Sequence, residues 1–365
     1  MALVSDLNPD PQHRRQMVYL LTQCGDVDHL ITTAIKEGLA GLLYKSLLEA
    51  DLLDTLSPEQ GQRLKNIYYR ILSHNLRLTH DLKEVLHRLR QKRIQVVVLQ
   101  GIDLIQQVYG DLGLRPLTDI DLWVLPGDYP RVVDTLINEG YTRNPLYPHL
   151  FKRGATLFDI HTHILWADRI PARKLLFRKG EEEVYRQTGI IHIEDQSARC
   201  LSSYDQVLYL SLHVLKHYVD RLIWLVDIRN LLVRWDRSDW TGFSKRVKEL
   251  GQERTVSYLF FLLLHLLGYR CPSNLMRPVE HPRLHILEKK ILEKRIKGKS
   301  LPLWAPVFLF SSGLGFKNRL FFILESLFPR PVILRQVFAA SPDLKFWQLY
   351  LKRSLQPFYH KRKIE

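Results

Sequence analysis

The spacing of hydrophobic and polar residues predicts helices at the start of the chain. Residues 26–50 carry apolar side chains at the spacing of one amphipathic helix, or of a helix pair interrupted near residues 38–41. A longer helical pattern covers residues 58–89. Residues 1–90 are therefore predicted to form an N-terminal helical segment.

Between residues 91 and 200 the pattern becomes that of a small sheet. A β-branched run at 94–99 ends at Gln100-Gly101, which predicts a strand, a glycine turn and a short helix at 103–109. Further strands are predicted at 118–124, 155–160 and 190–194, and a helix at 129–139 closed by Gly140. These elements predict a compact α/β core.

From residue 201 onward the period is helical again. Helices are predicted at 203–217, 221–235, 240–250 and 254–267. Prolines then divide the remainder into short aromatic-rich pieces, at Pro302, Pro306, Pro329, Pro331 and Pro342. The fold class expected is α+β, with a small mixed sheet at 91–200 between the N-terminal helices and a larger C-terminal helical domain at 201–365.

Acidic residues in two predicted strands point to metal chemistry. Asp119 and Asp121 project to the same side of their strand, while Ile120 and Leu122 pack on the other. Asp159 lies in a second apolar run that can pair beside the first. Carboxylate oxygens are the ligands that Mg²⁺ and Mn²⁺ prefer. The three carboxylates are therefore predicted to hold a divalent cation.

Such a cluster suits phosphoryl chemistry, because two metal ions can neutralise a triphosphate and activate an acceptor hydroxyl. Asp119 and Asp121 are expected to hold the ion bound to the triphosphate, and Asp159 to help hold the second ion and accept the hydroxyl proton. Arg115, just upstream, is expected to bind phosphate oxygens in a bidentate manner. Gly101 would let the backbone approach phosphate closely. An Asp-x-Asp pair also occurs in calcium loops, glycosyltransferases and surface turns. The prediction therefore depends on all of these residues together and not on that pair alone.

From about residue 38 to residue 232 the chain resembles the bacterial "uncharacterised nucleotidyltransferase" family, a branch of the polymerase-β-like nucleotidyltransferase superfamily. That family carries a Lys-Gly turn after a hydrophobic strand, an Arg-Pro-x-x-Asp-Ile-Asp-Leu strand, a Gly-Tyr pair and an acidic residue two before a histidine. The matching positions are Gln100-Gly101, 115–122, Gly140-Tyr141 and Asp159-Ile-His161. Further on, such proteins often show a histidine-bearing helix followed by an Arg-Leu and Trp-Leu-x-Asp segment. The corresponding positions here are His213, His217, Arg221-Leu222 and 224–227.

The resemblance implies metal-dependent transfer of a nucleoside monophosphate, with AMP expected, from a nucleoside triphosphate, expected to be ATP. The acceptor is a hydroxyl on a small molecule, a protein or an RNA. It implies a catalytic metal site at Asp119, Asp121 and Asp159, and a nucleotide site at Gln100, Gly101, Arg115 and Asp227. Gln100 replaces the family's lysine, so a descendant that binds without catalysis is the alternative.

Histidines and Asp227 leave other interpretations open. His161 and His163, with His213 and His217 one helical turn apart, offer ligands for a zinc hydrolase. A core or capping role for these histidines is the favoured interpretation, with His161 orienting Asp159. Asp227 either closes the site from the helical domain or pairs with Arg221 or Arg229.

Composition narrows the setting. The net charge of +15 favours polyanionic partners such as nucleotides, nucleic acids or anionic lipids. Three scattered cysteines fit reduced thiols in the cytoplasm. No signal peptide is expected, because the first residues lack a basic and then an apolar region. No run of eighteen apolar residues occurs, so no transmembrane helix is expected.

Aromatic and basic residues alternate near the C-terminus. The aromatic positions are Trp304, Phe308, Phe310, Phe316, Phe321 and Phe322, and Lys317 and Arg319 lie among them. Core packing is expected for most of them. Peripheral contact with an anionic membrane, or with a partner protein, is the alternative. The basic runs at 289–299 and 360–363 are expected to be a solvated helix face and a frayed terminus rather than a binding patch.

Overall fold

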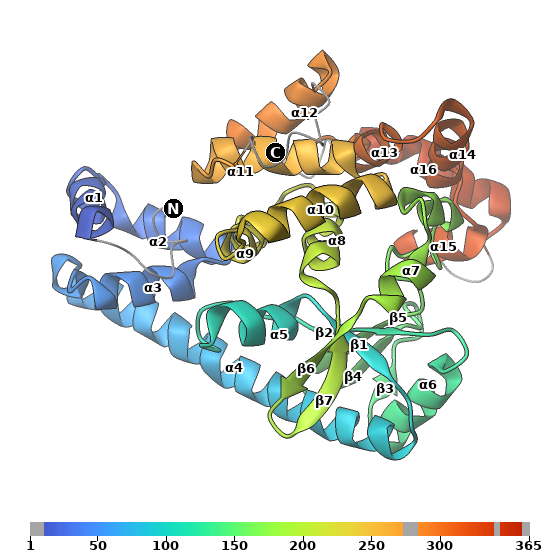
Figure 1. Ribbon diagram of the computed structural model, residues 1–365, viewed down its shortest axis with the longest axis horizontal. Coiled ribbons are helices and arrows are strands. Elements are labelled where there is room, and N and C mark those ends of the chain that lie inside the picture. Colours follow the sequence, from blue (N-terminus) through green and yellow to red (C-terminus); the bar gives the residue numbers. More distant parts are fainter. Residues whose placement is uncertain (1–10, 273–283, 339–343, 360–365) are drawn as a thin grey trace.

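The computed structural model describes residues 11–272, 284–338 and 344–359, and it has the α+β architecture expected from the sequence (Figure 1). A mixed sheet of seven strands occupies one half of the molecule, and helices from both ends of the chain form the other half. The basic run at 360–363 lies outside the described residues.

The N-terminal helices follow the predicted pattern. The pattern at 26–50 is a helix pair, separated by Gly38 with φ of +78°. A capping box between Ser57 and Gln60 begins the long helix α4, which runs from the N-terminal helices to the far end of the sheet (Figure 1). The helices are α1 (Pro11–Thr22), α2 (Val27–Lys36), α3 (Ala40–Glu49) and α4 (Pro58–Gln91), with a 3-10 turn at Leu53–Thr55.

The sheet has the order β3-β4-β5-β2-β1-β7-β6. The β1–β7 and β2–β5 pairs are parallel, and the other four pairs are antiparallel. Four strands were expected, whereas β3, β4 and β7 were not, because they are short or weakly apolar. The bounds are β1 (Val96–Leu99), β2 (Ile120–Val124), β3 (Thr142–Arg143), β4 (Leu150–Arg153), β5 (Thr156–His161), β6 (Gly189–Ile193) and β7 (Gln196–Cys200).

Short helices connect these strands. Helix α5 (Gly101–Leu104) continues as a π-helical turn at Ile105–Tyr109, where the sequence predicted one short helix. Helix α6 (Tyr129–Asn138) is followed by Gly140 in the left-handed conformation, as expected, with φ of +81°. A 3-10 segment at Pro171–Leu176 and helix α7 (Glu181–Arg186) lie between β5 and β6.

The described C-terminal half is helical, and the four long helices occur where they were predicted. They are α8 (Ser203–Lys216), α9 (Ile223–Leu232), α10 (Arg237–Leu250) and α11 (Glu253–Leu267). The aromatic-rich pieces are further helices, namely α13 (Ala305–Ser311), α14 (Phe316–Leu327), α15 (Pro331–Phe338) and α16 (Phe346–Tyr359), preceded by α12 (Ile286–Ile296). Among the described residues no helix is both long and apolar enough to cross a membrane.

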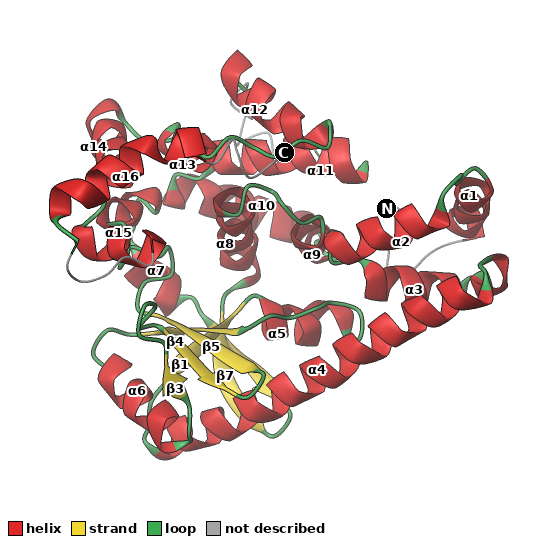
Figure 2. Cartoon of the chain, turned by 180° about the vertical axis from the view of Figure 1, so that it is seen from behind, coloured by secondary structure: helices red, strands yellow, loops and turns green. Residues whose placement is uncertain are grey.

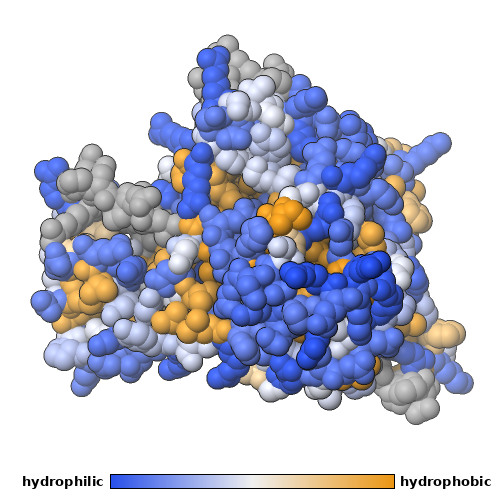
Figure 3. Space-filling model, turned by 60° about the horizontal axis from the view of Figure 1, so that its bottom comes forward, coloured by the Kyte–Doolittle hydropathy of each residue, from blue (hydrophilic) through white to orange (hydrophobic). Residues whose placement is uncertain are grey.

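Two hydrophobic clusters lie on opposite faces of the sheet. Ile120 and Leu122 belong to the cluster that packs under α4 and α6, as the alternation of β2 predicts. Trp123 faces the other cluster, which contains residues of both the N-terminal and the C-terminal helices. Figure 2 shows the sheet between α4 and the helices above it, and hydrophilic residues cover much of the face in Figure 3. The domain limits at 90/91 and 200/201 stay a prediction.

A buried ion pair joins α9 to the turn before β2. Arg115 Nε lies 3.0 Å from both carboxylate oxygens of Asp227, and Nη2 lies 2.9 Å from Oδ2. The Tyr109 hydroxyl donates a further hydrogen bond to Asp227, at 2.6 Å. Asp227 is fully buried and Arg115 is 5% exposed, so each charge depends on the other for its neutralisation.

Asp227→Asn should destabilise the protein strongly, because it leaves the Arg115 guanidinium buried without a counter-charge. We expect a loss of about 3–5 kcal/mol in the free energy of unfolding. Urea denaturation measures it. The matched control is Asp128→Asn, which removes the surface pair with Arg131 and should cost less than about 1 kcal/mol. Equal effects of the two substitutions would contradict the role given to the buried pair.

Candidate active site

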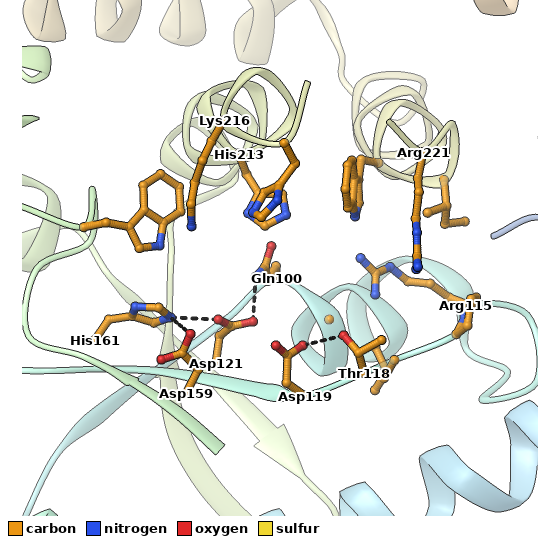
Figure 4. Close-up of a pocket in the computed structure, with 17 residues that line it drawn as sticks. Gln100, Arg115, Thr118, Asp119, Asp121, Asp159, His161, His213, Lys216 and Arg221 are labelled. Atoms are coloured by element: carbon orange, nitrogen blue, oxygen red, sulfur yellow. Dashed lines mark hydrogen bonds and ion pairs between the residues drawn. The ribbon is translucent and has the colours of Figure 1, made fainter. Parts of the chain in front are cut away.

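The three predicted acidic residues lie at one rim of the sheet. The β2–β5 register places Asp121 directly beside Asp159, and Asp119 precedes the first residue of β2 on the same face as Asp121. The predicted pairing of the two acidic strands is therefore confirmed. Figure 4 shows the three carboxylates on one side of a pocket.

The closest group of metal-ligating atoms comprises Asp121, Asp159 and His161, whose ligand atoms all lie within 4.8 Å of one another. Asp119 lies outside this group, although it lines the same pocket. The reason is strand geometry: residues two apart along a strand are separated by about 6.6 Å, but neighbouring strands by only about 4.8 Å. Asp159, on the neighbouring strand, therefore lies closer to Asp121 than Asp119 does, although Asp119 is nearer in the sequence.

His161 is paired with Asp121 more closely than with Asp159. Its Nε2 lies 2.7 Å from Asp121 Oδ1 and 3.6 Å from Asp159 Oδ2. Burial lowers the pKa of His161, but the two carboxylates outweigh it and the net direction is upward. Burial likewise opposes ionisation of Asp121, yet His161 holds the pKa of Asp121 below its usual value. The predicted role of His161 in orienting Asp159 is thus secondary to its contact with Asp121.

Proximity and burial make the remaining carboxylates reluctant to ionise. Burial and the charge of Asp121 raise the pKa of Asp119 to about 6, against a hydrogen bond from Thr118. Burial also raises the pKa of Asp159, with a further contribution from Asp121. A divalent cation would relieve this repulsion, and the imidazolium of His161 supplies part of that positive charge in its place. Carboxylate oxygens suit Mn²⁺ or Mg²⁺.

Gln100 belongs to the acidic wall. Its Nε2 donates a 2.5 Å hydrogen bond to Asp121 Oδ2, and its φ of +40° is a strained conformation for a residue with a side chain. Next to it, a Cβ atom added to Gly101 would lie 2.9 Å from Leu117 Cδ2. A side chain at position 101 would therefore have to displace the end of the Leu117 side chain, a contact that the sequence did not indicate.

Arg115 lines the pocket, but its bidentate edge is already used. The predicted bidentate contact with phosphate is replaced by the contact with Asp227, because Nε and Nη2 both bind that carboxylate. Asp227 pairs with Arg115 and not with Arg221 or Arg229, the partners considered from the sequence. Arg115 thus anchors the helical domain against the acidic wall.

The opposite wall of the pocket is basic and aromatic. It comes from α8, α9 and the loop after β5, and consists of Trp166, His213, Lys216, His217, Arg221, Ile223 and Trp224. The enclosed volume is about 190 Å³. Figure 4 shows Lys216 and His213 pointing toward the carboxylates. The sequence suggested no ligand role for Lys216 or Trp166. The available signal was the spacing of His213 and Lys216, which lie on one face of a helix.

The histidines do not assemble into a zinc site among the residues that the structure describes. His163 Nδ1 lies 3.0 Å from Glu181 Oε2 and is not part of the close metal-ligating group. His213 and His217 stack with ring centroids 4.5 Å apart. Burial and the charge of Lys216 lower the pKa of His217 to about 3. The geometry therefore favours the carboxylate site over the zinc hydrolase.

Comparison with known proteins agrees with this geometry. The family described as "Uncharacterised nucleotidyltransferase" matches residues 23–268, which is about two thirds of the chain and includes the acidic rim and α8–α11. The chain belongs to this family. No curated protein matches the chain.

Mn²⁺ affinity should fall as the pH is lowered through about 6. Protonation of Asp119 removes a negative charge beside the metal-ligating group and competes with the cation. One pH unit below that pKa, we expect an affinity about ten-fold lower than at pH 8, measured by calorimetry. Asp119→Asn should flatten this dependence, since it lacks the titrating group. An unchanged pH profile in that variant would contradict the assignment.

Proposed function

We propose that this protein is a metal-dependent nucleotidyltransferase that moves a nucleoside monophosphate, with AMP expected, from a nucleoside triphosphate to a hydroxyl acceptor. The observation that carries the proposal is the convergence of Asp121 and Asp159 on adjacent strands, with Asp119 at the same rim, opposite a basic wall. An acidic wall for cations facing a basic wall for phosphates matches the charge distribution of a metal-bound triphosphate. Membership of the family supports the same class.

The residues have separable roles. Asp121 and Asp159, with Asp119, would hold Mg²⁺ or Mn²⁺, which neutralises phosphate charge and lowers the pKa of the acceptor hydroxyl. The acceptor oxygen bonds to the α-phosphorus, the bond to the bridging oxygen breaks, and pyrophosphate leaves with the electron pair. Asp159 takes the hydroxyl proton, a role suited to a carboxylate whose pKa is raised.

The volume of the cavity limits which part of the nucleotide it can hold. Its volume of about 190 Å³ is below the roughly 300–1,000 Å³ of typical small-molecule sites. It would hold the phosphates while the nucleoside extends beyond it. The acceptor is a small molecule, a protein or an RNA, and the three free cysteines support a cytoplasmic setting.

Label transfer tests the proposal directly. Each α-labelled nucleoside triphosphate is incubated with the protein, Mg²⁺ and cell extract, and transfer is compared with that of Asp119→Asn/Asp121→Asn. We expect transfer from ATP, and its loss in the double variant by at least about 100-fold. Asp128→Asn, immediately before α6 in the same part of the chain, should behave as the wild type.

Two results would contradict the assignment. Label transfer that survives the double substitution would remove the acidic residues from the mechanism. Nucleotide binding without transfer to any component of the extract would favour the binding-only descendant that the glutamine at position 100 already suggests.

A further inference from the structure

Positive charge gathers on the pocket wall opposite the carboxylates. Lys216 is the last residue of α8, and its Nζ lies 3.6 Å from the centre of the Trp166 ring. Arg221 is exposed at the rim of the same pocket, and Arg173 lies 5.8 Å from the same Trp166 ring. Figure 4 shows Lys216, at the end of α8, and Arg221, in the loop before α9, pointing into the pocket from the side opposite the carboxylates.

Cationic and polar groups of this wall are available to bind an anion. Burial and the charge of Arg173 lower the pKa of Lys216 to about 7, although Asp121 and Asp159 oppose the shift. His213 is 8% exposed, and its Nδ1 has no hydrogen-bond partner among the described residues. Nε of Arg173, a residue near Trp166 that does not itself line the pocket, is also buried and has no hydrogen-bond partner among the described residues. Buried polar atoms are normally hydrogen-bonded, so unpartnered atoms beside several cations indicate a missing acceptor.

The other polar groups near the metal rim are committed elsewhere. The amide of Gln100 is bound to Asp121, and the bidentate edge of Arg115 is bound to Asp227. The backbone around the basic wall is also strained, since Trp166, Tyr218 and Val219 have φ of +58°, +59° and +55°. Strain of this kind persists at sites where geometry is functionally required.

We infer that Lys216 and Arg221 bind the β- and γ-phosphates of the nucleoside triphosphate, with His213 donating a further hydrogen bond to the same phosphates. This inference rests on the proposed function. It gives the helical domain, rather than the glycine turn after β1, the task of neutralising the triphosphate. Lys216 provides the positive charge that the neutral side chain of Gln100 does not.

The test measures binding of Mg²⁺-ATP and of AMP by calorimetry in wild type, Lys216→Met and Lys216→Arg. Methionine keeps an unbranched stem against Trp166 but removes the charge. We expect Lys216→Met to weaken ATP binding about ten-fold or more, with little change for AMP, and Lys216→Arg to retain most of the affinity. Lys245→Gln, an exposed lysine of α10 outside the pocket, is the matched control.

Arg221→Gln provides a second variant whose exposed position leaves folding intact, and it should weaken ATP more than AMP. Wild-type ATP binding with no loss in either variant would overturn the inference alone. An equal loss for ATP and AMP would also overturn it, because the contacts would then not be with the outer phosphates. If the wild type binds no nucleotide, the proposed function itself fails.

A second set of exposed side chains belongs to helices α14–α16, which carry large apolar residues. Phe316 and Phe321, for which core packing was expected, are among them. Phe310 and Phe322 are buried as expected, whereas Phe316 is 83% exposed and Trp347 is 62% exposed. We call this set the C-terminal apolar surface; it comprises Phe316, Leu320, Phe321, Leu324, Leu327, Phe328, Val332, Phe346, Trp347 and Leu351.

A groove of about 470 Å³ adjoins this surface. Leu327 and Phe328 line it together with Trp304 and Phe308 of the α13 region, and Arg353 lies at its edge. Arg319 stands 5.5 Å from the Phe308 ring. Between residues 316 and 354, the described residues include one acid, Glu325, which is bound to the backbone of Ala172, and seven bases. The bases are Lys317, Arg319, Arg330, Arg335, Lys345, Lys352 and Arg353.

We propose that this surface docks on an anionic lipid membrane. Apolar side chains flanked by Lys and Arg, with almost no acids, are the composition that binds headgroups and the outer acyl region together. A protein partner of opposite charge would meet the same bases, but exposed aromatic side chains together with an open apolar groove suit acyl chains better.

Vesicle sedimentation tests the proposal. The protein should bind vesicles of phosphatidylglycerol and phosphatidylcholine at about 1:1, but not pure phosphatidylcholine, and salt should weaken the binding. Phe316→Ser/Trp347→Ser should reduce it at least several-fold. Ile190→Ser, which removes an equally exposed residue of β6, should not. Absence of binding, equal binding to both vesicles, or self-association that the double variant abolishes would each overturn the proposal.

Discussion

Repulsion between carboxylates is the constraint on which the rest of this structure depends. The parallel pairing of β2 with β5 places Asp121 beside Asp159, with Asp119 one step away along the chain. Such a cluster cannot remain ionised in a buried rim without compensation. His161 and Gln100 provide it from within the sheet, and Lys216 adds positive charge from α8. The pocket is thus electrostatically poised for a divalent cation on one wall and an anion on the other.

A second buried charge pair, between Arg115 and Asp227, joins the C-terminal helices to the half of the molecule that contains the sheet. Asp227 of α9 binds Arg115 immediately before the acidic strand, so the helical domain is fixed against the sheet at the mouth of the pocket. This explains how a side chain on α8 can face a carboxylate on β2. It also removes Arg115 as a free ligand for phosphate. The arrangement assigns metal chemistry to the sheet and phosphate recognition to the helices.

The sequence predicted those parts of the fold and site that depend on local pattern. Strong periodicity located α4 and α8, and alternation in β2 put Asp119 and Asp121 on the face opposite Ile120 and Leu122. Short or weakly apolar strands such as β3, β4 and β7 gave too little signal. Phe316 and Phe321 of α14 were expected in the core but are exposed, because an apolar stripe does not reveal whether anything packs on it.

By itself, the chain determined the α+β class, the family and the acidic residues of the rim, since each follows from local sequence patterns. Only the tertiary structure decided which charges meet. Asp227 pairs with Arg115 rather than with nearby Arg229. His161 lies closer to Asp121 than to Asp159, which belongs to its own strand. Lys216 enters the site from α8, outside the sheet that carries the carboxylates. Such pairings depend on distances across the fold, where burial strengthens every charge interaction, and no local pattern encodes them.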